Sequence, residues 1–581
     1  MIMSEITYLE KIITAALAEF GVQSQIVLDK PKDLSFGDYS SNVAMINFNK
    51  VKDRFSSPQL FAKELAKLIK QADDKQLIVV VDVAGAGFIN FKIKDTNLWQ
   101  NLLSQLSENG IELTNLGKGR KVIVEYSSPN IAKPFTIGHL RSTIIGSAIA
   151  NLLEKSGYKV FRDNHLGDWG TQFGKQIVAI KRWGDEAILD NSANPVKELV
   201  DLYVKFHQEA ELDPQLEDEA RAWFTRLEQG DAEARRLWQK CIDWSFKEFA
   251  TIYQRLGVAF SENNGRGFGE SYFEDKMAEV IDELKAKKLA KEGEEGALLI
   301  FYPNEEMTPL MVQKKDGSTL YATRDLAADK WRRNNPRYQN PDGSAPIVIN
   351  EVGAEQAFYF KQLYRAEELL GWYGKDQRIH VKHGLYRFKE GKMSTRKGNV
   401  IWLSEVLDKA KAKALEINKD EQIAQAVSMA ALKWNDLKRK PEVNINFDWQ
   451  EMLQLQGNSG PYLLYTYVRA ASVIKKAKID LTGIKAKFNQ EAAISEEEKM
   501  LLQLLGDFSS SVQRATEELS PNILCNYLYD LSQAFNTFYN KQIIITAAES
   551  ERYNRLALTH QVAVIIKQGL NLLGIETLEE M

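Results

Sequence analysis

Cysteine is scarce in this sequence. Cys241 and Cys525 are the only two cysteines among 581 residues, and they lie far apart in the chain. Two distant thiols exclude a disulfide framework and the CxxC spacing of a zinc or redox site. We expect both to be buried thiols in hydrophobic cores.

Long hydrophobic runs and an excess of charge of one sign are also missing. The first twenty residues include Glu5, Glu10 and Lys11, unlike a signal peptide, and the longest apolar helical stretch, 144–153, is shorter than the ~18 residues of a membrane span. The 75 Lys and Arg against 79 Asp and Glu leave a formal charge of −4, so any nucleic acid must be bound by local basic patches. We expect a soluble, cytoplasmic protein with no membrane partner.

The chain is long enough for about three or four domains. In residues 1–115, a helical pattern from Ile6 to Leu17 is followed by strand-like runs at 77–83 and 88–93. This pattern predicts a small α+β domain. The polar, glycine-containing stretch that follows predicts a domain boundary.

Residues 116–447 are predicted to form a Rossmann-like α/β domain with a doubly wound parallel sheet. A strand at 122–126, a loop, a helix over 139–158 and a strand at 159–162 give its first half, and the charged stretch 196–256 predicts a helical insertion. We assign three later strand-like segments to the second half of the same sheet: 298–302, 347–352 and 379–387. Residues 448–581 are predicted to form an all-α helical bundle.

The loop between that first strand and helix is the most informative stretch. It ends in Thr136-Ile137-Gly138-His139 at a predicted helix N-terminus, whose free N–H groups and positive dipole end suit phosphate. Gly138 lets a ligand approach the backbone closely, and Lys133 and His139 supply donors. On these residues alone, a nucleotide site and an ordinary loop both remain open.

Two motifs resemble those of class I aminoacyl-tRNA synthetases, in the form found in the arginyl-tRNA synthetase family. The run from Glu125 to Thr143, which reads EYSSPNIAKPFTIGHLRST, resembles the family's His-Ile-Gly-His signature, with Thr136 at the first histidine. The run GKMSTRKG from Gly391 to Gly398 resembles the Lys-Met-Ser-Lys-Ser loop. The resemblance covers essentially the whole chain.

This resemblance implies a site for ATP with Mg²⁺, and no zinc. An amino-acid carboxylate attacks the α-phosphorus of ATP, and cations meet the charge that builds on the departing pyrophosphate. Residues 375–397 carry eight Lys or Arg against Asp376 and Glu390, a net charge of +6. The implied catalytic residues are His139, Lys133, Lys392 and Arg396, and the implied ATP-binding residues are Thr136, Gly138, His139, Met393 and Ser394.

A pocket that selects arginine needs carboxylates and an aromatic surface to face a planar guanidinium. Tyr321 and Asp325 are four residues apart, so they share one face if a helix starts there, and Glu125 ends the first strand of the sheet. The residues alone do not separate a pocket from an ordinary surface. The resemblance implies that these three bind the arginine side chain and that Asn130 and Gln356 hold its α-amino end.

The stretch from Asn164 to Gly174 also resembles the family pattern, and we predict that it lines the site. Gln172 is its strongest candidate for direct substrate contact, and His165 is predicted to be structural lining. His380 is predicted to pack within a strand. His383 is a candidate nucleotide contact.

The two terminal domains are predicted to bind tRNA. The resemblance implies contacts by Phe88 and Asn90 in the N-terminal domain, a ring and an amide that suit stacking and base-edge reading; a core position for Phe88 is the alternative. In the C-terminal domain it implies contacts by Tyr462 and Arg469. Leu464 stands where the family pattern has a polar residue.

The implied function is that of a monomeric arginine-tRNA ligase. It would activate L-arginine with ATP and transfer it to tRNA(Arg), with tRNA required for activation. Two alternatives from other classes stay open: a nucleotidyltransferase outside translation with a similar core, and a catalytically silent paralogue that only binds RNA.

Overall fold

The computed structural model describes residues 5–29, 31, 36–293, 295–387, 401–452, 454 and 456–581. The chain divides into two units. One unit comprises Met1–Ile111, Ala470–Phe508 and Leu531–Ile565, and the other, the α/β unit, comprises Glu112–Arg469, Ser509–Asp530 and Ile566–Met581. The predicted domain boundaries near residues 115 and 447 remain predictions. Within the described part of the chain, no helix has the length and apolar character needed to cross a membrane.

The predicted parallel sheet is confirmed at the centre of the α/β unit. Its strands run in the order β10 (Arg378–His383), β9 (Ile347–Gly353), β4 (Lys121–Glu125) and β5 (Lys159–Asp163). The chain passes from β4 to β5 on one side and then returns to β9 and β10 on the other. The carboxyl ends of β4 and β9 therefore form the switch point at which open α/β sheets bind ligands.

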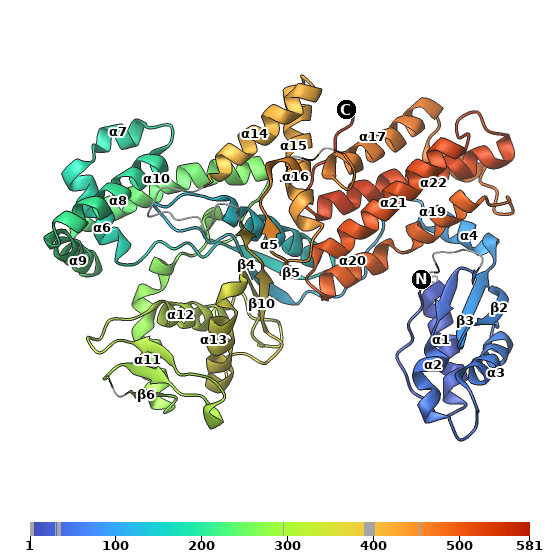
Figure 1. Ribbon diagram of the computed structural model, residues 1–581, viewed down its shortest axis with the longest axis horizontal. Helices are drawn as coiled ribbons and strands as arrows, with labels where there is room; N and C mark the ends of the chain where they lie inside the picture. Colours follow the sequence, from blue (N-terminus) through green and yellow to red (C-terminus); the bar gives the residue numbers. More distant parts are fainter. Residues whose placement is uncertain are drawn as a thin grey trace. The chain divides into compact units, whose positions relative to one another are not determined.

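Helices cover both faces of this sheet (Figure 1). The predicted first helix is confirmed as α5 (Ile137–Lys155), and it packs across β4, β5 and β9. On the other face, Ile123, Phe161 and Val348 form a hydrophobic core with α11 (Met277–Ala286), α12 (Tyr321–Asn334) and α13 (Ala357–Leu370). This two-sided burial explains why the two central strands contain the continuous apolar runs Val122–Val124 and Ile347–Ile349.

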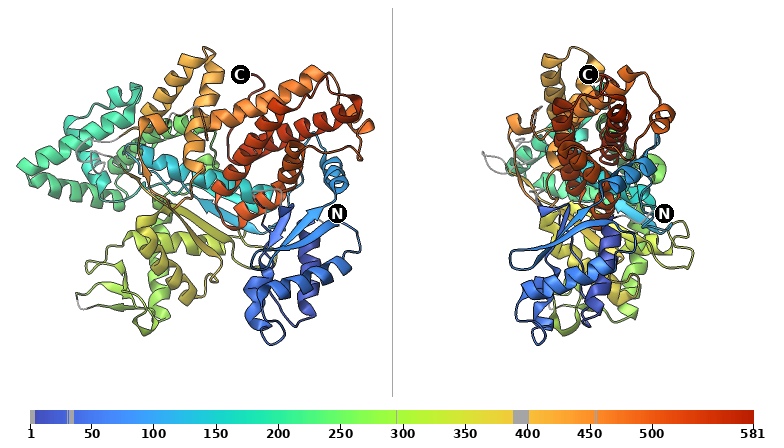
Figure 2. Two further views of the ribbon diagram at one scale, coloured as in Figure 1. Left: turned by 45° about the vertical axis from the view of Figure 1, so that its right-hand side comes forward. Right: turned by 90° about the vertical axis from the view of Figure 1, so that its right-hand side faces the viewer.

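The predicted helical insertion is confirmed, and it begins earlier than residue 196. Its helices gather in one lobe (Figures 1 and 2): α6 (Gln172–Trp183), α7 (Glu186–Asn191), α8 (Pro195–Leu212), α9 (Gln215–Glu228) and α10 (Ala232–Leu256). The long α10 is capped by Asp231, whose side chain accepts from the N–H groups of Glu233 and Ala234, and ends at Gly257 with φ of 60°. Cys241 is buried in this helix, as predicted.

The assignment of 298–302 to the parallel sheet is wrong. Here β7 (Leu298–Ile300) lies between β6 (Ala290–Glu292) and β8 (Leu310–Gln313) in a separate antiparallel sheet. Only five residues connect β6 to β7, too few for the crossover that a parallel neighbour requires. They include Gly296, which has a φ of +80°.

The predicted strand over 379–387 is two strands. After β10, the short β11 (Tyr386–Arg387) leaves the main sheet and pairs with β12 (Ile445–Asn446). The chain turns at Gly384, where a Cβ atom would lie 2.6 Å from the main chain of Val443. A side chain at this position would block the approach that lets the chain leave the sheet.

The helical character of the C-terminal part is confirmed. Before it come α14 (Leu403–Ile417) and α15 (Glu421–Leu437). Its helices are α16 (Trp449–Met452), α17 (Gly460–Ala477), α18 (Leu481–Ala486), α19 (Glu496–Gly506), α20 (Phe508–Glu517), α21 (Pro521–Lys541) and α22 (Glu549–Leu572). Cys525 is buried in α21, as predicted.

The N-terminal α+β prediction is also confirmed. An antiparallel sheet, β1 (Tyr39–Ser41), β3 (Phe88–Ile93) and β2 (Ile78–Ala84), packs with α1 (Glu5–Ala18), α2 (Val43–Asn47) and α3 (Pro58–Gln71), and α4 (Asp95–Gln105) follows. Only one face of each strand carries the core, which gives β3 its alternating pattern of buried Ile89, Phe91 and Ile93.

Candidate active site

The register of the sheet brings three polar side chains together at the switch point. Glu125 at the end of β4 is paired with Asp163 on β5 and with Asn350 on β9. Asn350 Nδ2 donates to Glu125 Oε1 at 2.8 Å, and Arg332 Nη2 on α12 lies 2.5 Å from Glu125 Oε2 and 2.8 Å from Asp163 Oδ2. One buried guanidinium therefore holds the acids of two neighbouring strands.

This ionic network continues under the sheet edge. Arg332 Nη1 lies 3.1 Å from Asp329, which Arg378 holds with both terminal nitrogens at 2.6 and 2.9 Å. Burial acts to raise the pKa of Glu125, but the cations of Arg332 and His165 outweigh it and lower that pKa to about 2. Glu125 thus keeps its negative charge across the physiological pH range.

Asp325, the second predicted acid, lies on the same helix as Arg332. The predicted helix start at Tyr321 is confirmed, so Tyr321 and Asp325 are one turn apart on α12. The hydroxyl of Tyr359 donates to Asp325 Oδ2, and the rings of Tyr321 and Tyr359 pack edge to face at 4.9 Å. Tyr321 is 53% exposed, which leaves an aromatic surface open beside the carboxylate.

The loop after β4 carries backbone strain. Ser127, Ser128 and Ala132 have positive φ angles of 74°, 46° and 57°, which non-glycine residues adopt at a cost of ~1 kcal/mol or more and retain mostly at functional sites. Helix α10 holds this conformation, because Tyr253 Oη lies 2.9 Å from Ser127 Oγ and Ser245 Oγ accepts from the Ala132 N–H at 2.9 Å. The helical insertion therefore shapes the loop.

The first turn of α5 fixes the chemical form of His139. The main-chain N–H of Thr136 donates to His139 Nδ1 at 3.0 Å, and Thr136 Oγ1 lies 3.2 Å from the same atom. Burial lowers the pKa of His139 to about 4, so the ring is neutral at pH 7. Because Nδ1 is the acceptor, the proton sits on Nε2, which becomes a donor for a ligand. Within the described part of the chain, a Cβ atom at Gly138 would meet only Thr136 Oγ1, at the ordinary contact distance of 3.5 Å.

Asn130 and Gln356 lie at the ends of the two switch-point strands. Asn130 is exposed in the loop after β4 and forms a parallel bridge with Gly167, whose Cβ would lie 2.1 Å from Asn130 Oδ1. Gln356 is exposed in the turn that follows β9. Lys133 and Gln172 line a small cavity of about 10 Å³, and Gln172 Nε2 donates to the carbonyl of Trp169 at 3.0 Å.

Lys392, Met393, Ser394 and Arg396 lie outside the described residues, but the chain on both sides of that segment is anchored to the start of α5. On one side, Arg141 Nη1 donates to the carbonyl of Gly384 at 2.8 Å. On the other side, the main-chain N–H of Ile137 donates to the carbonyl of Ile401 at 3.1 Å. The flanks of the second predicted motif are therefore tied to the helix that carries the first.

The two histidines of β10 have partners in the sheet. His380 packs on Phe360 at 4.6 Å, with Nε2 3.1 Å from the Val352 carbonyl oxygen, which agrees with its predicted packing role. His383 Nδ1 lies 2.9 Å from Glu351, and this acid raises the pKa of His383 although burial opposes it. The predicted nucleotide contact of His383 would compete with this ion pair.

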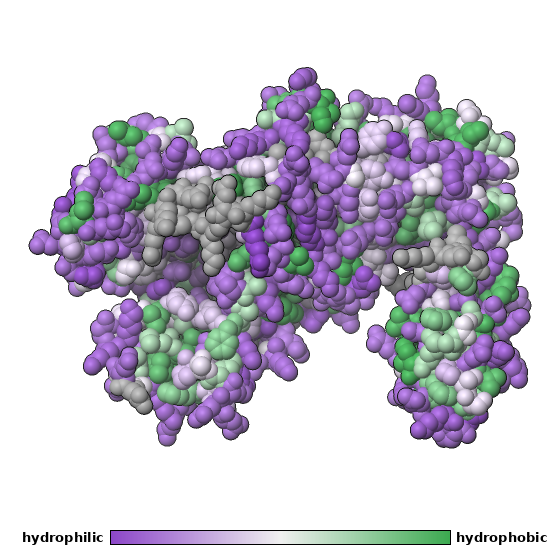
Figure 3. Space-filling model, in the orientation of Figure 1, coloured by the Kyte–Doolittle hydropathy of each residue, from purple (hydrophilic) through white to green (hydrophobic). Residues whose placement is uncertain are grey.

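The predicted tRNA-binding residues differ in exposure. Phe88 follows a tight turn and is 41% exposed, so the core alternative is wrong, whereas Asn90 is buried and its Oδ1 accepts from Ser40 at 2.7 Å. Figure 3 shows apolar residues among polar ones on the surface of the N-terminal α+β part of the chain. Val79 and Val80 of β2 are two exposed apolar residues of this part.

On α17, the predicted tRNA-binding side chains pack against other rings. Tyr462 packs on Tyr529 at 5.7 Å, and Arg469 donates to the hydroxyl of the exposed Tyr465 at 3.0 Å. Leu464 is fully buried. It therefore serves the helical core, not a contact with a ligand.

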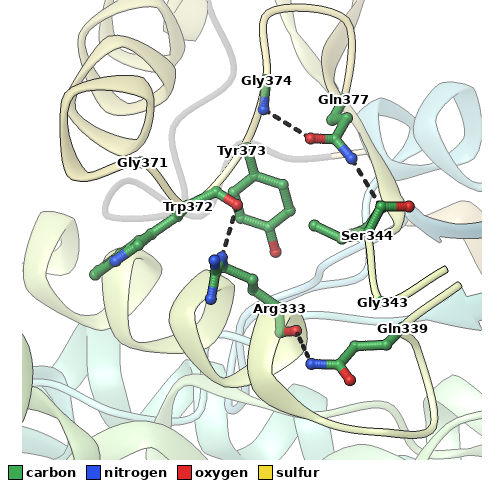
Figure 4. A pocket seen from close by; sticks show the side chains of 10 residues that line it. Arg333, Gln339, Gly343, Ser344, Gly371, Trp372, Tyr373, Gly374 and Gln377 are labelled. Atoms are coloured by element: carbon green, nitrogen blue, oxygen red, sulfur yellow. Dashed lines mark hydrogen bonds between the residues drawn. The ribbon is translucent and has the colours of Figure 1, made fainter.

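A cavity of about 320 Å³ lies away from these residues, where β9 and β10 begin (Figure 4). Its polar groups are paired with one another: Arg333 Nε donates to the Trp372 carbonyl at 2.8 Å, and Gln377 Nε2 donates to the Ala345 carbonyl at 2.8 Å. None of the predicted site residues that the structure describes lines this cavity.

Sequence reasoning missed four residues of the site: Asp163, Asn350, Arg332 and Tyr359. Asp163 and Asn350 could have been predicted from the sequence, because side chains at the ends of neighbouring parallel strands meet at one edge of the sheet. Arg332 could also have been predicted. It lies seven residues after Asp325, and two helical turns place both residues on one face of the helix. Nothing in the sequence marks Tyr359 as the partner of Asp325.

The comparisons with known proteins agree with this architecture. Residues 100–449 match the family model described as tRNA synthetases class I (R), catalytic domain; residues 463–581 match the DALR anticodon binding domain; and residues 7–93 match the arginyl tRNA synthetase N terminal domain. The sheet with its switch-point site is thus the catalytic fold of a class I tRNA synthetase.

Close relatives narrow the class to one family. The arginine–tRNA ligases of Exiguobacterium sp. and Clostridium acetobutylicum are 39% and 38% identical to this chain, each over 96% of both proteins. The chain therefore belongs to the arginyl-tRNA synthetase family. Its fold is similar to that of the arginyl-tRNA synthetases of Thermus thermophilus (TM-score 0.78, 25% identity) and Plasmodium falciparum (TM-score 0.82, 22% identity), each match covering both chains fully.

Proposed function

We propose that this chain is an arginine-tRNA ligase that activates L-arginine with ATP and transfers it to tRNA(Arg). The observation that carries this proposal is the pair of acids at the switch point, Glu125 and Asp325, with Tyr321 beside Asp325 and the His139 loop directly after the strand that Glu125 ends. A guanidinium needs carboxylates and a ring face. A phosphate needs donors at a helix N-terminus.

In this proposal, the acids select the substrate. Asp325 accepts from the guanidinium, Tyr321 covers its face, and Glu125 supplies a charge that Arg332 and Asn350 keep in place. Asn130 and Gln356 hold the α-amino end. A neutral side chain of the same shape is rejected because it would not supply the charged donors that Asp325 accepts from.

In the first chemical step, a carboxylate oxygen of arginine bonds to the α-phosphorus of ATP and the bond to pyrophosphate breaks. His139 Nε2–H, the backbone at Gly138 and the Thr136 hydroxyl serve the phosphates and the nucleotide, with Met393 and Ser394 from the second motif. Lys133, Lys392 and Arg396 stabilise the charge on pyrophosphate. In the second step, a hydroxyl of the tRNA 3′ end attacks the arginyl carbonyl and AMP leaves.

Mg²⁺ belongs to this proposal as the companion of ATP. It is held in such sites largely by substrate phosphates, where it neutralises charge. The described residues contain no group of three or more His, Cys, Asp or Glu side chains placed to hold a metal ion.

The tRNA is proposed to bind through both helical and N-terminal parts of the chain. Phe88 supplies an exposed ring, with Asn90 two residues further on the same strand face, and Tyr462 and Arg469 lie on α17. We propose a monomer, and a tRNA that must be bound before arginine is activated.

The test is ATP–pyrophosphate exchange with each of the 20 amino acids, with and without unfractionated tRNA. Exchange with arginine alone, and only with tRNA, is the expected result. Exchange without tRNA would keep the ligase and remove the requirement for tRNA. Exchange with no amino acid would replace the proposal by an RNA-binding protein without catalysis.

The arginine pocket has its own test in Asp325→Asn. Loss of one charged acceptor should lower kcat/KM for arginine about 30- to 150-fold, the equivalent of ~2 to 3 kcal/mol. The matched control is Asp376→Asn, which changes an exposed acid of the same unit. Equal activity of the two variants would remove Asp325 from the pocket.

A further inference from the structure

His165, in the loop after β5, has one ring nitrogen with a fixed partner and one without. Its Nδ1 lies 3.0 Å from the carbonyl oxygen of Phe268. A carbonyl oxygen only accepts, so Nδ1 carries a proton. Its Nε2 is buried without a hydrogen-bond partner and lies 3.6 Å from Asp325 Oδ1.

The groups around the ring are mainly acids. Glu125 comes from β4, Asp325 from α12, Asp168 from the ring's own loop, and Glu270 from the turn Glu270–Lys276. The cations are Arg332, which is shared among three acids, and Arg324, which lies 3.1 Å from Glu270. A neutral ring with Nδ1–H would turn the lone pair of Nε2 toward a carboxylate, which is unfavourable.

A proton on Nε2 removes that conflict. Burial acts to lower the pKa of His165, but Asp325 and Glu125 outweigh it and raise that pKa to about 10. Without a ligand, the ring is therefore an imidazolium at neutral pH and adds a cation to this acidic pocket beside Arg332 and Arg324.

Arginine brings a second cation to the same acids. Its guanidinium has only donors and does not lose its charge in proteins. A protonated Nε2 beside it would add a like charge and another donor, whereas a neutral Nε2 would add an acceptor.

We propose that arginine and a proton on His165 Nε2 compete for this pocket: the guanidinium displaces the proton to solvent, and the neutral ring then accepts a hydrogen bond from it. The inference rests on the proposed arginine site. It makes His165 a specificity-determining residue, because a neutral ureido isostere of arginine cannot take the place of the displaced charge.

The test is isothermal titration of arginine into the full chain from pH 6 to pH 8, in phosphate and in Tris, whose ionisation enthalpies differ. Release of about one proton per bound arginine is expected, and the dissociation constant should fall up to tenfold per pH unit. A constant that does not change with pH, with no proton released, would overturn the proposal.

Two variants isolate the ring. His165→Asn keeps an N–H in the place of Nδ1 for Phe268 and removes Nε2, so it should bind arginine without releasing a proton. His165→Gln keeps an acceptor near Nε2 that does not titrate, so its affinity should be the same at pH 6 and pH 8. A variant that still releases the proton would show that another group supplies it.

Two further measurements complete the design. His560→Asn, in the other unit, should keep the wild-type proton release, and titration with citrulline should release none. Protons from arginine itself are common to all variants, so they cancel in the comparison. Failure of arginine to bind at every pH would instead contradict the proposed function.

Discussion

Among the described residues of the α/β unit, Arg141 and Arg332 are the most deeply buried arginines, and their donors meet different acceptors. Arg141 on α5 is 1% exposed and Arg332 on α12 is 2% exposed. Most donors of Arg141 go to main-chain carbonyl groups, whereas those of Arg332 go to carboxylates. Arg141 therefore joins separate segments of the chain, whereas Arg332 keeps the acids of the candidate active site ionised and in place.

The acceptors of Arg141 come from three parts of the chain. Its nitrogens lie 2.7 to 3.2 Å from Asp436 Oδ1 on α15 and from the carbonyl oxygens of Gly384, Pro441 and Val443. The hydroxyl of Tyr386 donates to the other oxygen of Asp436 at 2.9 Å. Arg141 thus fixes the first turns of α5 against the chain that leads into the second motif.

The acceptors of Arg332 are Glu125, Asp163 and Asp329. Carboxylates can take up protons when they lose a cation, whereas carbonyl groups cannot. The cost of removing Arg332, whose acceptors are three carboxylates, should therefore depend more strongly on pH than the cost of removing Arg141, whose acceptors are one carboxylate and three carbonyl groups. Three experiments test this difference.

The largest effect on stability is expected for Arg141→Met. The change leaves a buried carboxylate and three carbonyl groups without donors, so the free energy of unfolding should fall by about 3 to 5 kcal/mol. Urea unfolding followed by tryptophan fluorescence measures it. The control is Arg182→Met, which removes the exposed ion pair with Glu219 and should cost ~0 to 1 kcal/mol. Similar losses in both variants would contradict the distinction between them.

Arg332→Met should cost a similar amount at pH 7, but its deficit should depend on pH. In the wild type, the pKa of Glu125 is about 2, below its unfolded value of ~4.3. Ionised Glu125 therefore stabilises the fold above pH ~4, and this contribution is lost as the pH falls toward 2. Without Arg332, burial raises the pKa of Glu125 above the unfolded value, so folding takes up a proton.

The deficit of Arg332→Met relative to wild type should therefore shrink as the pH falls from 7 toward 4, by up to ~1.4 kcal/mol per pH unit. Urea unfolding at pH 7, 6, 5 and 4 measures this trend. Arg141→Met serves as the matched variant with a smaller expected change, because three of its four orphaned acceptors are carbonyl groups, which do not titrate. A deficit that stays constant with pH would show that lost packing, and not charge, dominates at Arg332.

The sequence predicted most elements of the fold because their periodicity is local. The helix of α5 and the buried strands β4, β5 and β9 follow directly from apolar spacing. Sheet membership is not local, which is why the strand at Leu298–Ile300 was placed in the wrong sheet. Only the length of the connection after β6 carried that information.

The candidate site was likewise predictable only where the information is local in the sequence. The helix that brings Tyr321 and Asp325 to one face could be predicted from their spacing. The ion pair between Arg332 and Glu125 could not be predicted. It depends on the register of three strands and on a helix more than 200 residues away in sequence. The strain at Ser127 and Ser128 depends on the helical insertion that holds it, which no local pattern reveals.

The smallest effects are expected from two tyrosine hydroxyl groups, one in each arginine cluster. Tyr386 donates to Asp436, and Tyr364 donates to Asn350 Oδ1 at 2.8 Å, on the amide that holds Glu125. Tyr386→Phe and Tyr364→Phe should each lower the free energy of unfolding by about 1 to 2 kcal/mol. Only Tyr364→Phe should raise the KM for arginine, by a few-fold, because its amide can rotate and release Glu125. A rise in both variants would mean that the Arg141 cluster also shapes the pocket, and a rise in neither would make both clusters purely structural.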